Sequence, residues 1–104
     1  MPDARSILRL FAVSGAAWMI AGCGGVLYTA KINAVEAKVE NAKELGAEAS
    51  APYEYYSARE RVQKAKEEAS RADYQDAVDL LDEAETFADK AVAQAGAVRR
   101  GAGR

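Results

Sequence analysis

Apolar residues recur every three or four positions along most of the chain, a spacing that places side chains on one face of an α-helix. Three such segments follow one another, over about residues 28–47, 52–72 and 74–97. In the first, the apolar positions are Ile32, Val35, Val39, Ala42 and Leu45 with Gly46. In the second they are Tyr55, Ala58, Val62, Ala65 and Ala69, and in the third Ala77, Leu80, Leu81, Ala84, Phe87, Ala88, Ala91 and Ala95. The pattern predicts an all-α fold, either an antiparallel three-helix bundle or an open array containing a helical hairpin.

Residues that commonly end or begin helices stand between these segments. Gly46 is of a type that often ends a helix. Ser50 is expected to cap the second helix, and Pro52 suits its first turn because an N–H group there has no partner in the helix. Asp73 is expected to cap the third helix. The second and third helices are therefore expected to be joined by a tight turn.

The first quarter of the chain has the layout of a secretory signal. Arg5 and Arg9 precede an uncharged stretch, Leu10–Ile20, and small residues follow before Cys23. This stretch is short for a membrane span, which needs about 20 apolar residues. An uncleaved membrane helix over residues 7–28 approaches that length and is the alternative to a signal peptide.

The residues Ile20, Ala21, Gly22 and Cys23 resemble the lipobox of bacterial lipoproteins, in which an aliphatic and two small residues precede a cysteine. In that family the thiol receives a diacylglyceryl group, the preceding peptide is removed, and the new amino terminus is acylated. The resemblance implies a signal peptide at residues 1–22 and lipid attachment at Cys23. Stable anchoring needs more than one acyl chain, and this modification supplies them.

The expected mature protein begins at Cys23 and divides into three parts. Residues 23–27 are expected to be the lipid-bearing cysteine and a short, glycine-containing flexible tether. Residues 28–97 form the helical domain, and residues 98–104 form a basic tail that is expected to fray. A glycine rather than an aspartate follows the cysteine, and resemblance to enteric lipoproteins then implies the outer membrane, facing the periplasm.

Composition and charge narrow the classes of function. The 104 residues include 14 Lys or Arg, 16 Asp or Glu, one Cys and no His. Nucleic-acid binding normally needs a concentrated basic face, which this near-balance argues against. Histidine, the usual general base, is absent, and no set of zinc ligands is present. The acidic run Asp73–Asp89 lacks the ligand spacing of a calcium loop. We expect no enzymatic activity, cofactor, metal or small-molecule substrate.

A cluster of tyrosines at the start of the second helix is the candidate contact site. Tyr53 and Tyr56 share one helix face and Tyr55 points elsewhere, so one face is expected to pack and the other to be exposed. Two interpretations remain open: packing against the first helix, or a docking patch for a partner or a glycan.

Two resemblances concern the rest of the chain. Residues 72–84 (ADYQDAVDLLDEA) resemble the second half of a tetratricopeptide unit. The matching positions are Ala72, Tyr74, Ala77, Leu81 and Ala84. The region Gly46–Ala95 resembles a family of short bacterial envelope lipoproteins that is catalogued as a domain of unknown function. This resemblance implies a helical fold and an envelope location, and it implies no activity.

The expected function is that of a lipid-anchored envelope protein serving as a structural or adaptor component. Its alanine-rich helix faces bury little apolar area each, so a body of this size is expected to be marginally stable alone. A protein partner or self-association is therefore expected besides the membrane. The alternatives are an accessory subunit of an envelope transport, secretion or motility complex, and the single-pass membrane protein with the uncleaved helix.

Overall fold

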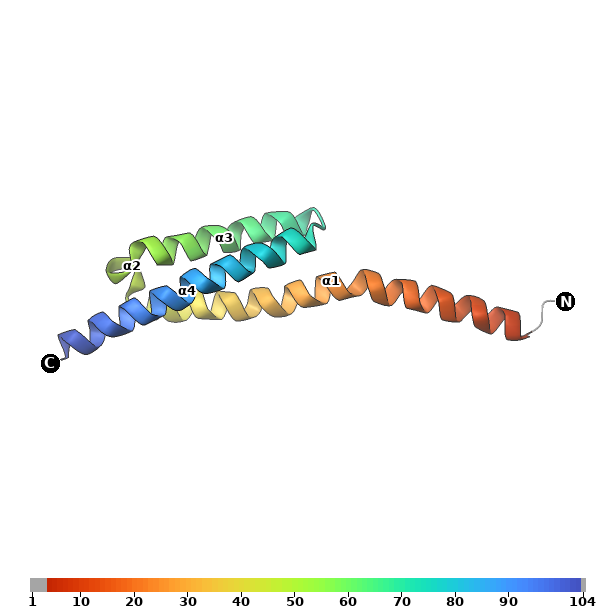
Figure 1. Cartoon of the computed structure of the whole chain (residues 1–104), viewed down its shortest axis with the longest axis horizontal. Helices are drawn as coiled ribbons and strands as arrows, with labels where there is room; N and C mark the ends of the chain where they lie inside the picture. Colours follow the sequence, from red (N-terminus) through yellow and green to blue (C-terminus); the bar gives the residue numbers. More distant parts are fainter. Residues whose placement is uncertain (1–3, 104) are drawn as a thin grey trace.

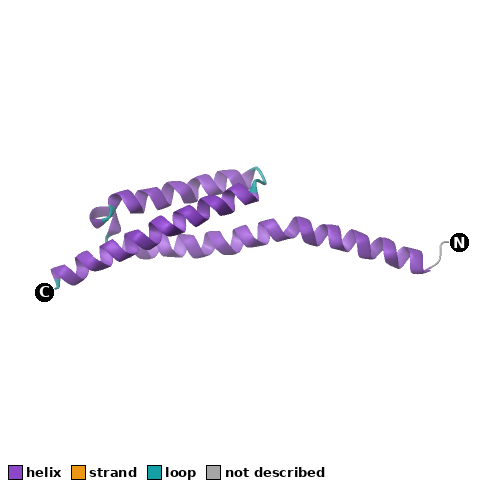
Figure 2. Cartoon of the chain, viewed as in Figure 1, coloured by secondary structure: helices purple, strands orange, loops and turns teal. Residues whose placement is uncertain are grey.

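A computed structural model describes the backbone of residues 4–103 and the side chains of residues 24–103. This part of the chain contains α1 (Ala4–Glu44), α2 (Ala47–Ser50), α3 (Pro52–Ser70) and α4 (Tyr74–Ala102) (Figure 1). Within residues 4–103 the chain is almost entirely helical and no strand occurs (Figure 2). The predicted all-α class is confirmed.

The long helices form an up-down-up bundle in which α1 and α4 run parallel. Helices α3 and α4 make an antiparallel hairpin, and the second half of α1 lies along it (Figure 1). Lys31 of α1 pairs with Asp82 of α4. Seven residues further along both helices, Lys38 pairs with Asp89. Because the partners advance together, α1 and α4 share one direction and α3 opposes both.

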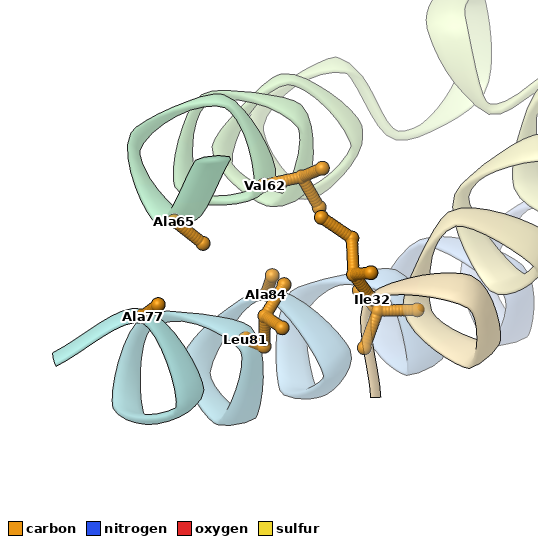
Figure 3. Packing of buried hydrophobic residues seen from close by; sticks show 7 residues of the cluster. Ile32, Val62, Ala65, Ala77, Leu81 and Ala84 are labelled. Atoms are coloured by element: carbon orange, nitrogen blue, oxygen red, sulfur yellow. The ribbon is translucent and has the colours of Figure 1, made fainter. Parts of the chain in front are cut away.

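The core nearest the α3–α4 turn draws on all three long helices, whose buried side chains gather between the ribbons (Figure 3). Its members are Ile32, Val35, Val62, Ala65, Ala77, Leu81 and Ala84. Leu81 and Val35 are the largest fully buried side chains among the described residues. The alanines allow close helix approach, but each buries less apolar area than a leucine does.

A second core lies at the opposite end of the bundle, beside α2. It consists of Ala42, Ala47, Ala51, Tyr55, Ala91 and Ala95. Every apolar position predicted from the helical spacing is buried or half-buried in the bundle, except Gly46. The three predicted helix faces are therefore confirmed.

The connection between α1 and α3 agrees only partly with the sequence-based prediction. Gly46 has a left-handed backbone (φ 84°) directly after α1, as expected for a residue that ends a helix, and Pro52 is the first residue of α3. The expected cap at Ser50 is wrong. Ser50 is the last residue of the extra helix α2, and its hydroxyl donates to the Gly46 carbonyl across 3.0 Å, while Ala51 occupies the N-cap position of α3. Because the extra helix α2 includes Ser50, the N-cap of α3 is the next residue, Ala51.

The predicted tight turn between α3 and α4 is confirmed and closes with two backbone hydrogen bonds. The N–H of Asp73 donates to the Glu68 carbonyl across 2.9 Å, and that of Ala72 donates to the Ala69 carbonyl across 3.0 Å. This is the Schellman pattern of helix endings, in which Ala72 takes the left-handed conformation (φ 62°) that glycine usually supplies. Asp73 stands at the N-cap position of α4, but its side chain makes no capping hydrogen bond.

Two helices are longer than predicted. Helix α1 is continuous from Ala4 to Glu44, so residues 23–27, expected to be a flexible tether, lie within it. No proline interrupts the chain between Pro2 and Pro52, and a glycine pair weakens a helix without breaking it. Helix α4 continues to Ala102, past the expected end near residue 97. The positive charges of Arg99 and Arg100 in its last turn stabilise this extension, because they lie at the negative end of the helix dipole.

The predicted signal peptide and the predicted lipid site at Cys23 concern side chains outside residues 24–103, the part whose side chains are described. Within the described part of the chain, no helix combines the length and apolar character needed to cross a lipid bilayer.

Candidate functional site

The three clustered tyrosines divide between the interior and the surface, as their helical spacing predicts. Tyr55 is 2% exposed, whereas Tyr53 and Tyr56, three positions apart on one side of α3, are 70% and 46% exposed. The packing interpretation is therefore right for Tyr55. Only Tyr53 and Tyr56 remain available to a partner.

Tyr55 joins α3 to α2 and to its own helical neighbours. Its hydroxyl donates to Oε1 of Glu48 across 3.2 Å, and its ring meets the Tyr56 ring edge to face at 5.1 Å. The Arg59 guanidinium lies 5.8 Å from the ring centroid. Burial, and then the hydrogen bond to Glu48, raises the pKa of the Tyr55 phenol. These contacts give Tyr55 a structural role in the second core.

Tyr53 belongs to an aromatic and basic patch that spans α3 and α4. Its ring meets the Phe87 ring edge to face at 5.9 Å. The Arg61 guanidinium lies 4.4 Å from the Phe87 centroid, and the Lys90 ammonium lies 5.7 Å from it. Arg61 also pairs with Glu83 across 2.9 Å. The aromatic and charged side chains of this patch thus contact one another and hold α3 against α4.

Tyr56 instead lines an open groove between α1 and α3. Helix α1 packs more extensively on α4 than on α3, and the space between α1 and α3 has a volume of about 470 Å³. We call this space the α1–α3 groove. Its lining residues include Glu36, Val39 and Glu40 from α1 and Tyr56, Arg59 and Lys66 from α3.

The two walls of the groove differ in charge. The α1 wall is acidic, with Glu36 and Glu40, and the α3 wall carries Arg59 and Lys66 together with one acid, Glu60. Lys66 and Glu36 pair across 2.5 Å. Val39, which is half-buried, supplies apolar surface within the groove, and Val62, only 7% exposed, lies at its base. The arrangement can accept an elongated, amphipathic object, and it presents no nucleophile with a base beside it.

A second hollow of about 780 Å³ lies where α1 passes the α3–α4 turn. Tyr28 and Tyr74 face each other here, with ring centroids 6.0 Å apart. Burial raises the pKa of the Tyr28 phenol. A Cβ placed on Gly24 would lie 3.5 Å from Cβ of Tyr74, so this glycine lies against the start of α4. We call this region, comprising Gly24–Tyr28 and Ala69–Tyr74, the tyrosine end.

The acidic run of α4 takes part in ion pairs with α1. Asp82, Glu85 and Asp89 face Lys31 and Lys38. Hydrogen bonds to these carboxylates are the main cause that raises the pKa of both lysines. Within the described part of the chain, no group of three or more His, Cys, Asp or Glu side chains is placed to hold a metal ion.

Sequence reasoning identified Tyr56 and missed the rest of the groove. The two walls of the groove come from segments about twenty residues apart in the sequence. The residue pattern of each segment, taken alone, is typical of an ordinary solvent-exposed helix face. The sequence signal for the groove was Val39, a residue of the predicted apolar face of α1 that is only half-buried and lies beside the groove.

Comparison with known proteins identifies a family to which most of the chain is similar. The sequence pattern of one family, Domain of unknown function (DUF4398), matches residues 30–102. No curated protein and no solved structure gives a significant match. The matched region is more than half of the chain and contains all of α2, α3 and α4 and both walls of the α1–α3 groove. The chain therefore belongs to the DUF4398 family, as the resemblance to a domain of unknown function led us to expect.

Proposed function

We propose that this protein is a lipid-anchored, non-enzymatic component of the bacterial cell envelope that acts as an adaptor. Lipid on Cys23 holds it at a membrane, by preference the outer membrane facing the periplasm. The helical body binds an amphipathic helix of a partner protein in the α1–α3 groove. The observation that carries the adaptor role is this groove, which lies between two helices of a bundle that is otherwise closed by α4.

The shape of the groove favours a helix as its occupant. A three-helix bundle with one open corner becomes a four-helix bundle when a further helix fills that corner. Val39, which is half-buried, and Tyr56, which is 46% exposed, supply the apolar contact that such a helix needs. The added helix also covers apolar surface that alanine-rich faces leave thinly buried.

The charges of the groove define the partner further. A helix lying in the groove places one edge near Glu40 and the other near Arg59, since Glu36 and Lys66 already pair with each other. Charge complementarity favours a partner helix with Lys or Arg on the first edge and Asp or Glu on the second. The same helix-in-groove contact would also hold the protein as an accessory subunit of an envelope transport, secretion or motility complex. That alternative differs from the adaptor role only in the identity of the partner.

The anchor rests on the sequence of the lipobox, Ile20–Cys23. A second candidate retains residues 7–28 as an uncleaved membrane helix. The observation that favours it is that α1 continues through Cys23 as a single helix. The two candidates share the adaptor role and differ in whether Met1–Gly22 remains on the mature protein.

Site-specific photo-crosslinking in intact membranes tests the groove. A benzophenone amino acid replaces Tyr56, and in a matched control it replaces Tyr53, which is more exposed but stands outside the groove against Phe87. We expect a discrete product from position 56 and none of the same mass from position 53. The mass of the product shows whether the partner is another protein or a second copy of this chain.

A charge variant completes the test. Arg59→Glu makes the α3 wall acidic like the α1 wall, and we expect it to remove the product formed at position 56. The exposed residue Lys64, which does not line the groove, serves as the control in Lys64→Glu. Identical products from positions 56 and 53, or a product that survives Arg59→Glu, would exclude the groove as the binding site.

A further inference from the structure

We infer that the tyrosine end of the bundle rests on the lipid surface, at the boundary between headgroups and acyl chains. The inference builds on the proposed membrane anchor. It adds a defined orientation, with the α3–α4 turn at the membrane and the α2 end directed away from it.

Exposed apolar side chains mark this end of the molecule. Val26 is 71% exposed and Leu27 is 57% exposed, and both belong to the short part of α1 beside the α3–α4 turn. Of the five large hydrophobic side chains that are exposed among the described residues, these two are the most N-terminal. Two adjacent exposed aliphatic side chains form a small apolar surface that a lipid interface would cover.

The exposed pair continues an uncharged segment of the sequence. No charged residue occurs between Arg9 and Lys31, so the uncharged run extends from Leu10 to Ala30. Its last residues are those of the tyrosine end. Lys31 begins the charged part of α1 and pairs at once with Asp82 on the body of the bundle. Along α1 the change from apolar to charged surface therefore falls just after the tyrosine end, and the exposed Arg71 and Asp73 of the α3–α4 turn suit the level of the lipid headgroups.

Tyrosine is suited to the place where this change occurs. Its ring is apolar and its hydroxyl seeks water, so tyrosines gather at membrane interfaces. Tyr28 on α1 and Tyr74 on α4 lie together at this level, 6.0 Å apart between ring centroids. The hollow beside them, lined mainly by small and apolar residues such as Val26 and Ala69, is open to the outside and can receive acyl chain or glycerol groups.

The closeness of Gly24 to Tyr74 fixes which end of the bundle lies nearest Cys23. A Cβ atom placed on Gly24 would be in ordinary contact with the Tyr74 side chain, so the start of α4 is level with Cys23. Helix α1 is continuous there, so the residues after Cys23 do not act as a swivel. Whether the membrane holds lipidated Cys23 or an intact α1, the same end of the bundle meets the lipid.

Tryptophan fluorescence of the protein extracted from membranes with its anchor and reconstituted in phosphatidylcholine vesicles tests the inference. Trp18→Phe removes the one native tryptophan, and three single probes are then added: Leu27→Trp, Tyr74→Trp and Val98→Trp. Val98 is the matched control for Leu27, because the two side chains are similarly exposed (55% and 57%) and lie at opposite ends of the bundle. Far-ultraviolet circular dichroism checks that each variant keeps its helix content.

Brominated phosphatidylcholine, which quenches tryptophan within the acyl region, supplies the measurement. We expect the probes at positions 27 and 74 to lose most of their emission and to shift to shorter wavelength, and the probe at position 98 to keep its emission. Quenching at 27 without quenching at 74 would overturn the inference, because the bundle would then stand clear of the lipid while α1 alone contacts it. That result leaves the proposed anchor intact, whereas a chain that fails to associate with vesicles contradicts both.

Discussion

Lys38 of α1 donates to Oε1 of Glu85 on α4 across 3.0 Å and pairs with Asp89 across 3.1 Å. The residue one heptad earlier, Lys31, pairs with Asp82 on the same face of α4. These pairs connect two helices that are parallel and far apart in sequence. Together with the shared core they hold α1 along α4, and the α1–α3 groove lies on the side of α1 that packs less extensively.

The Lys38–Glu85 pair should make a measurable contribution to stability. A double-mutant cycle with Lys38→Ala and Glu85→Ala is expected to give a coupling of about 0.2–1 kcal/mol, the usual range for ion pairs near the surface. The measurement is the free energy of unfolding in urea at low salt. A coupling that does not diminish as salt is added would contradict the electrostatic origin of the pair.

Stability should fall at alkaline pH, partly through Tyr55. Its folded-state pKa lies above the ordinary tyrosine value of about 10, so the neutral phenol stabilises the fold fully below that pH. This contribution is lost as the pH rises through the folded-state pKa. Lys31 and Lys38, whose pKa values are also raised, lose their contributions in the same direction.

The comparison of parent and Tyr55→Phe isolates the tyrosine from the lysines. The variant loses the hydrogen bond to Glu48 and is expected to be less stable at pH 7 by about 0.5–1.5 kcal/mol. It is also expected to lose less stability than the parent between pH 9 and 11, as read from urea unfolding monitored by circular dichroism. Equal losses in both proteins over this range would show that Tyr55 does not titrate with the fold.

Leu81 should be the most sensitive position in the core. It is fully buried where α1, α3 and α4 meet, and half of the other buried residues of this core are alanines, which cannot expand to fill a cavity (Figure 3). Leu81→Ala is expected to cost about 2–5 kcal/mol, which a small alanine-rich bundle does not withstand well. Val98→Ala, at an exposed position, is expected to change the free energy of unfolding by less than about 0.5 kcal/mol. Similar thermal melting of the two variants would contradict the packing described.

Ala72 is a site where one substitution should raise stability. It holds a left-handed backbone at φ 62°, which costs a residue with a Cβ about 1–2 kcal/mol. Glycine adopts this conformation freely but loses more chain entropy on folding, so Ala72→Gly is expected to stabilise by about 0.5–1 kcal/mol. Ala93→Gly, on the exposed face of α4, is expected to destabilise by about 1 kcal/mol. A fall in melting temperature for both variants would rule out strain at Ala72.

The sequence was sufficient for the elements of this fold and insufficient for their assembly. The three- and four-residue spacing identified the buried faces, and Gly46 and Pro52 marked helix ends, because these properties depend on neighbours along the chain. The separation of Tyr55 from Tyr53 and Tyr56 followed from helical geometry in the same way. Helix α2 escaped prediction because one turn of four residues has no repeating pattern.

The groove and the tyrosine end could not be predicted because both depend on distances between helices. Nothing local to Lys31 specifies Asp82 as its partner, and that pairing places α1 beside α4. The contact of Gly24 with Tyr74 likewise joins residues fifty positions apart. In the sequence, the glycine pair indicated a flexible tether. In the structure, one of these glycines lies against an aromatic side chain within a continuous helix.

The intact mass of the protein extracted from membranes tests the proposed anchor most directly. Residues Cys23–Arg104 carrying the mass of a diacylglyceryl group and an amide-linked acyl chain are the expected species, and replacing Cys23 with alanine is expected to leave the full-length chain without that mass. A membrane-extracted parent protein that still contains Met1–Gly22 and carries no lipid would contradict the lipid anchor.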